Sequence, residues 1–191
     1  MNEDTSVSRS AADAMPKEVQ DHLSALADQL NGLAVAILPT GVRDGKAYYL
    51  ETDAEARKLA RSVGLEAKYL YDAHNRAYLH EYSADWVINL AIAIGHGIST
   101  ELVVSLGKYI FARARSAVRR GQYDGDENRL PLRVTIQQVK RNDQGEITFD
   151  GLAFEGETQA VVASLREALI AMQEAPRSRE IESGGSGNEP Q

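Results

Sequence analysis

The stretch of residues 86–107, WVINLAIAIGHGISTELVVSLG, decides how this chain folds. It contains no lysine or arginine and is dense in Ile, Leu, Val and Ala. A run of about 20 apolar residues is long enough to cross a bilayer, and Lys108 and four arginines follow it, as basic residues flank many membrane spans. Asn89, His96 and Glu101 oppose that interpretation, because an ionisable group at the centre of a span costs roughly 2.5–3.5 kcal/mol on insertion scales.

A break in the middle of this stretch favours a folded hairpin. Gly95-His96-Gly97 is typical of a turn, and Ser99 or Thr100 is suited to cap a following helix. We therefore expect residues 86–107 to form a buried helical hairpin, with membrane insertion as the alternative. Because a small domain has little core to cover such a run, we also expect a homo-oligomer.

Composition divides the rest of the chain into two lobes between two tails. Residues 1–14 and 175–191 are rich in small and polar residues and are predicted to be disordered, since they cannot bury enough apolar surface to offset their ordering entropy. Residues 15–83 are predicted to form an N-terminal α+β lobe. Residues 84–174 are predicted to form a lobe with a helical hairpin, a β-hairpin and a C-terminal helix.

In the first lobe the turn and apolar patterns predict secondary-structure elements in the order αββαββ. Asp44-Gly45 predicts a tight turn, so the apolar runs 33–38 and 47–50 are expected to be antiparallel strands. Alternating tyrosines predict two more strands at 66–72 and 76–83.

In the second lobe the order is ααββα. Residues 142–145 predict a hairpin loop, and a change in the phase of the apolar residues predicts a bulge at Asp150-Gly151. A helix is expected over 157–172. The chain is thus predicted to be an α+β protein, with helices packed on mainly antiparallel sheet.

The helix that follows residue 107 is predicted to carry a basic face. Segment 108–141 has nine basic and three acidic residues, although the formal net charge of the chain is −7. A basic face can meet phosphate, lipid headgroups or an acidic partner, but the few aromatic residues near it disfavour nucleic acid. The candidate interaction residues of this face are Lys108, Arg113, Arg115, Arg119 and Arg120.

A second candidate surface is aromatic. Six of the eight tyrosines fall between residues 48 and 82. Tyrosine serves both as an anchor at protein interfaces and as a packing residue on half-buried sheets, so both interpretations remain open. The candidates are Tyr69, Tyr71, Tyr78, Tyr82 and Trp86.

The sequence gives little support for catalytic activity. The absence of cysteine excludes disulfides, thiolate metal sites and cysteine nucleophiles. Glu66-Ala67-Lys68 resembles half of a Mg²⁺-dependent nuclease pattern, but no aspartate is expected on the adjoining strand. We predict no metal, no cofactor and no enzymatic activity.

These observations favour a cytoplasmic protein of bacterial type, because the N-terminus lacks the features of a secretory signal. The leading functional hypothesis is a non-catalytic protein-interaction or adaptor module that associates with itself or with another protein. Membrane association through residues 86–107 is the second hypothesis, and a Mg²⁺-dependent nuclease using Glu66 and Lys68 is the third.

Overall fold

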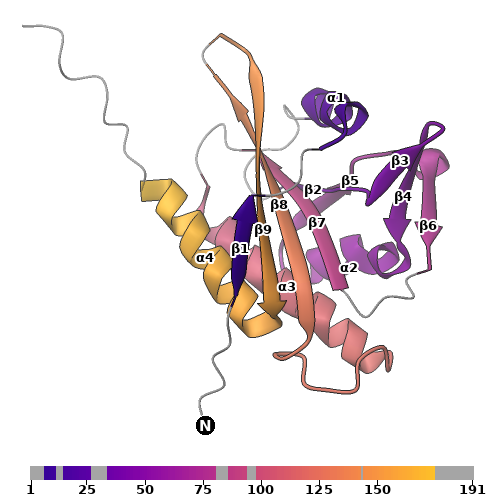
Figure 1. Cartoon of the computed structure of the whole chain (residues 1–191), viewed down its shortest axis with the longest axis vertical. Helices are drawn as coiled ribbons and strands as arrows, with labels where there is room; N and C mark the ends of the chain where they lie inside the picture. Colours follow the sequence, from indigo (N-terminus) through magenta and orange to yellow (C-terminus); the bar gives the residue numbers. More distant parts are fainter. Residues whose placement is uncertain are drawn as a thin grey trace, which may run out of the picture.

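A computed structural model describes residues 7–11, 15–26, 34–80, 86–93, 98–142 and 144–174, and it confirms an α+β fold (Figure 1). The strands are β1 (Ser8–Ala11), β2 (Ala34–Ile37), β3 (Gly41–Arg43), β4 (Lys46–Leu50), β5 (Glu66–Tyr69), β6 (Arg76–Leu79), β7 (Trp86–Ala93), β8 (Pro131–Arg141) and β9 (Ile147–Glu157). The helices are α1 (Lys17–Leu26), α2 (Ala56–Ser62), α3 (Thr100–Arg119) and α4 (Thr158–Glu174), with short 3-10 turns at Glu51–Glu55 and Ala73–Asn75.

The strands form two mixed sheets. The larger has the order β1-β9-β8-β7-β2-β5, and the smaller has the order β3-β4-β6. β7 runs parallel to β8 and antiparallel to β2, and α3 provides the crossover connection that neighbouring parallel strands require. Strands from both predicted lobes lie in the larger sheet, and one hydrophobic cluster contains buried residues from both.

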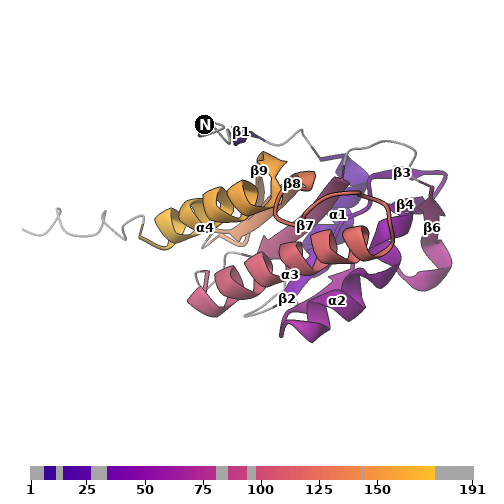
Figure 2. The same ribbon diagram turned by 90° about the horizontal axis from the view of Figure 1, so that it is seen from below.

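Three helices cover one face of the larger sheet, with α3 between α2 and α4 (Figure 2). Ser99 caps α3 as predicted, because its hydroxyl accepts a hydrogen bond from the Leu102 amide at 3.1 Å. The fully buried Leu106, Tyr109 and Ile110 place α3 in the main core. The N-terminal part of α1 lies on the opposite face, since Val19 lines a cavity there with alternate residues of β8.

The prediction of a helical hairpin over residues 86–107 is wrong. Residues 86–93 form a central strand, and the helix begins at Thr100. A strand that is covered on both faces is a continuous apolar run and lacks the alternation that identifies exposed strands, so the pattern did not distinguish it from a buried helix. In the part of the chain that is described, no helix combines the length and apolar character that a membrane span requires.

Two strand pairings also differ from those expected. The turn at Asp44-Gly45 is confirmed, but it joins β4 to β3, while β2 belongs to the larger sheet. β5 and β6 do not pair with each other, because β5 lies beside β2 and β6 beside β4.

The predicted bulge at Asp150-Gly151 is absent, since β8 and β9 pair without interruption from Pro131↔Glu157 to Arg141↔Ile147. Phe149 and Phe154 occupy odd and even positions of β9, so they face opposite sides of the sheet. That reversal explains the change of phase in the sequence.

Candidate interaction groove

A groove of about 440 Å³ lies along the outer side of α3 and α4. Apolar and small side chains make up most of its lining, and cationic side chains make up the rest. The lining residues are Val63, Val104, Gly107, Lys108, Phe111, Ala112, Arg115, Val162 and Arg166.

A close approach between the two helices shapes the groove. A Cβ atom added at Gly107 would lie 3.2 Å from Cγ1 of Val162, which is closer than most carbon contacts. Glycine at this position therefore lets α4 pack against α3 with little separation. Val104 and Phe111 lie one turn to either side of Gly107 on α3, and both are half-buried.

Positive charge lies on both helices. Lys108 and Arg115 come from α3, and Arg166 comes from α4. Arg115 is engaged by Glu127, whose Oε1 accepts hydrogen bonds from Nε at 2.9 Å and from Nη2 at 2.7 Å. Lys108 and Arg166 have no acidic partner within the described ranges, and no carboxylate is among the described lining residues. The groove is thus an apolar channel bordered by cations.

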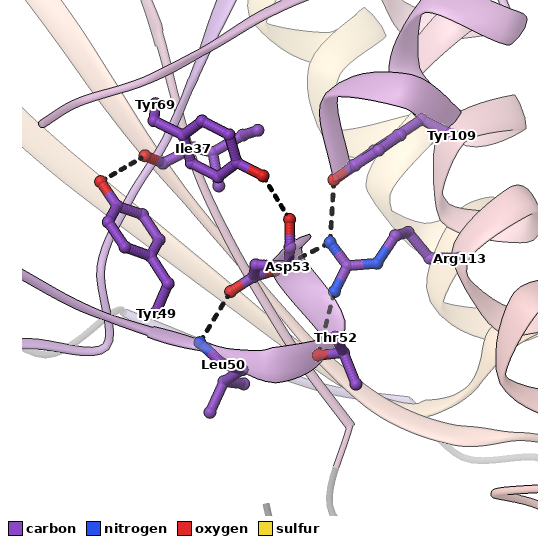
Figure 3. A network of polar contacts seen from close by, with 8 residues as sticks. All are labelled: Ile37, Tyr49, Leu50, Thr52, Asp53, Tyr69, Tyr109 and Arg113. Atoms are coloured by element: carbon purple, nitrogen blue, oxygen red, sulfur yellow. Dashed lines mark hydrogen bonds and ion pairs between the residues drawn. The ribbon is translucent and has the colours of Figure 1, made fainter. Parts of the chain in front are cut away.

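A buried polar network anchors α3 to the 3-10 turn Glu51–Glu55 (Figure 3). Asp53 and Arg113 are only 5% and 3% exposed, and Arg113 Nη1 lies 2.9 Å from Asp53 Oδ1. Arg113 also donates to the hydroxyl of Tyr109 at 2.9 Å and to that of Thr52 at 3.3 Å. The other carboxylate oxygen of Asp53 accepts from the Leu50 amide at 3.2 Å.

The prediction that Arg113 belongs to an outward basic face is therefore wrong. α3 is covered by the sheet and by helices on both flanks, so its buried surface is wider than one apolar stripe. Arg113 points toward Asp53 (Figure 3), a partner sixty residues earlier in the chain.

Burial and neighbouring charges shift the pKa values of Arg113 and Tyr109 in this network. Burial alone would lower the pKa of the Arg113 guanidinium, but Tyr109 and Asp53 raise it above its usual value. Burial raises the pKa of Tyr109, although the neighbouring Arg113 partly offsets the effect. Arg113 consequently stays charged, and Tyr109 stays neutral, across the physiological range.

The other basic candidates lie at the C-terminal end of α3. Arg119 and Arg120 are exposed, and Arg120 forms an ion pair with Glu55 of the 3-10 turn that precedes α2. Both positions extend the basic surface beyond the groove lining, on the end of α3 where cations complement the helix dipole.

The aromatic candidates do not form one exposed surface. Tyr71 is buried and Tyr69 half-buried, and the hydroxyl of Tyr69 donates to the carbonyl of Asp53. Trp86 packs against a small cluster that contains Ala114, Ala117 and Leu130. Of the described candidates only Tyr78 is exposed, at 44%, and Tyr82 lies outside the described residues.

The nuclease candidates lie on one edge strand of the larger sheet. Glu66 and Lys68 form an ion pair at 3.4 Å on the edge strand β5, and their neighbours in register on β2 are Ala34 and Ala36. Within the described ranges, no group of three histidine or acidic side chains is arranged to hold a metal ion.

The sequence matches no protein-family model, and no curated protein or solved structure is significantly similar to the chain. The functional argument therefore depends on the groove. Sequence reasoning found Lys108 and Arg115 but missed Arg166, although Arg166 follows Val162 by one helical turn and so extends the same side of α4.

Proposed function

We propose that this protein is a non-catalytic interaction module that binds an acidic, amphipathic helical segment of a partner protein in the groove along α3 and α4. The observation that carries the proposal is the apolar channel with cations on both helices. A helix laid in such a groove places its apolar side on Val104, Phe111 and Val162, and its acidic flanks beside Lys108 and Arg166.

Charge complementarity favours this occupant over others. Lys108 and Arg166 remain without acidic partners in the described chain, so an acidic segment would supply the missing countercharges. Nucleic acid binds mainly through phosphate contacts and does not require an apolar floor. An enzyme would require a reactive constellation, and none of the described side chains that line the groove is a carboxylate, histidine or hydroxyl nucleophile.

The structure removes the original reason for expecting a homo-oligomer. The apolar run that motivated it is buried within one chain, because Leu90, Ala91 and Ile92 are fully buried in β7. Association with a second copy stays a prediction of the sequence, and the experiment below distinguishes it from binding of another protein. A cytoplasmic location stays a prediction of the sequence.

Selection from a displayed library of random 16-residue peptides tests the proposal even though the partner is unidentified. The enriched peptides should carry apolar residues at three- and four-residue spacing, flanked by Asp and Glu. Their binding should be lost on a Lys108→Glu/Arg166→Glu variant. It should persist on a Lys17→Glu/Lys46→Glu variant, which changes the net charge equally at exposed positions outside the groove.

Two results would oppose the proposal. One is a selection whose peptides lack acidic residues or bind both variants equally. The other is binding to phosphatidylserine vesicles that the groove variant abolishes, because it would assign the cations to lipid headgroups. Light scattering on the native protein and the groove variant would show whether the bound segment comes from a second copy.

A further inference from the structure

The two faces of the central strands β7 and β8 differ in polarity. On the face that α3 and α4 cover, Leu90 and Ile136 are fully buried, as expected for a sheet that stays covered. On the other face, Asn89, Thr135 and Gln137 line a cavity of about 320 Å³ under the start of α1. Polar side chains suit a sheet face that meets water for part of the time.

Few specific contacts attach α1 to the sheet. Within the described residues, the side-chain hydrogen bonds of α1 all end on carbonyl oxygens of residues 15–26, and no ion pair joins this segment to another element. The donors are Gln20, His22 and Ser24. The buried side chains of Val19 and Leu23 hold the helix in place. By contrast, a buried ion pair with Asp53 fixes α3.

The contact between α1 and Tyr71 leaves a buried hydroxyl unpaired. Tyr71 is 4% exposed, and the ring of His22 stacks on it with the centroids 4.2 Å apart. The Tyr71 amide donates to the hydroxyl of Tyr49 at 3.3 Å, but Tyr71 Oη has no hydrogen-bond partner in the described structure. A buried hydroxyl without a partner is unfavourable, and withdrawal of the His22 ring would let water reach it. The position of α1 on the sheet therefore carries a cost that an open position removes.

We propose that α1 is a displaceable cover, which opens from the polar face of the larger sheet while the sheet and the other helices stay folded. The open state hydrates Tyr71 Oη and the polar side chains of β7 and β8, whereas the closed state buries Val19 and Leu23. A helix of ten residues is marginal in water on its own, so α1 unfolds when it opens. The inference does not depend on the groove, which lies on the opposite face of the sheet.

Hydrogen exchange of the full-length protein, read for single amides by NMR, tests whether α1 opens on its own. The amides of residues 20–26 should share one opening equilibrium and exchange at least about 100-fold faster than the slowest amides of α3. The proposal is overturned if the α1 amides exchange as slowly as those of α3. It is also overturned if protection rises steadily toward the middle of α1, because that pattern is fraying of the helix ends.

Tyr71→Phe gives a readout that a merely structural tyrosine would not give. Phenylalanine keeps the ring and removes the unpaired hydroxyl, so the closed state should gain and exchange in α1 should slow about tenfold. Tyr123→Phe is the matched control, because the hydroxyl of Tyr123 donates to the Arg129 carbonyl beyond the end of α3. It should leave exchange in α1 unchanged.

A single thiol under α1 reports the opening of the cover directly. The chain has no cysteine, so Gln137→Cys supplies the only thiol for reaction with N-ethylmaleimide. Adding Tyr71→Phe should slow that reaction about tenfold, whereas it should not change the reaction of Arg129→Cys at an exposed position outside the cavity. The proposal is overturned if Tyr71→Phe speeds exchange in α1, or if it leaves the reactivity of Gln137→Cys unchanged.

Discussion

Replacing Arg113 with methionine should destabilise the fold strongly, because it leaves the buried carboxylate of Asp53 without its cation. Both side chains are almost completely inaccessible, and the carboxylate would retain only the Leu50 amide as a hydrogen-bond donor in the described structure. Breaking one side of a buried ion pair costs about 3–5 kcal/mol. For a chain of 191 residues this corresponds to a melting temperature roughly 6–20 °C lower.

Arg115→Met is the matched control, since Arg115 lies two residues further along α3 and is paired with Glu127 at the surface. An exposed pair contributes about 1 kcal/mol or less. Urea unfolding at 25 °C, followed by circular dichroism, measures both variants. The double variant Asp53→Leu/Arg113→Met should recover much of the loss, because no unpaired charge then remains.

The reasoning would be refuted if Arg113→Met lowered the free energy of unfolding no more than Arg115→Met does. It would mean that Asp53 is solvated, and that the ion pair does not hold α3 against the 3-10 turn Glu51–Glu55.

Three further outcomes are expected. Burial raises the pKa of Tyr49 and of Tyr109 above the usual value of 10.0, so the folded state retains protons that the unfolded state releases. The contribution of these two tyrosines to stability should be constant below pH 10 and should fall above it by about 1.4 kcal/mol per pH unit for each tyrosine; an unfolding free energy that does not fall between pH 10 and pH 11 would contradict this. Leu90→Ala in the centre of β7 should cost about 2–5 kcal/mol in urea unfolding, because Leu90 is fully buried, and a negligible cost would remove β7 from the core. Ser99→Ala should cost about 1 kcal/mol through loss of the cap on α3, whereas Ser99→Asp should preserve stability; equal losses for the two would contradict the cap.

The elements that could be predicted from the sequence are those that local chemistry determines. Asp44-Gly45 adopts positive φ angles in a hairpin turn, Ser99 caps α3, and the hairpin around 142–145 joins two long strands. Each of these signals lies within a few residues of the feature that it determines.

The parts that were mispredicted depend on contacts between distant residues. β7 is a strand because β2 and β8 pair with it, and an apolar run alone does not reveal such partners. Arg113 points inward because Asp53 arrives from another element, which helical angles within α3 cannot show.

The groove and the cavity beside α1 also depend on contacts between distant residues. The groove requires α4 beside α3, so Arg166 gave no signal until the two helices were brought together. The polar residues of β8 alternate as an exposed strand would, and the start of α1 together with residues 38–41 encloses them in a cavity.

The most direct test of the groove is a fluorescence anisotropy titration of one selected acidic peptide against three proteins. These are the native chain, the Lys108→Glu/Arg166→Glu variant and the Lys17→Glu/Lys46→Glu control. Reversing each groove cation replaces attraction with repulsion and should cost about 1 kcal/mol, so Kd should rise about 30-fold for the groove variant. The control should bind within about threefold of the native chain. Equal weakening in both variants, or none in either, would contradict binding in this groove.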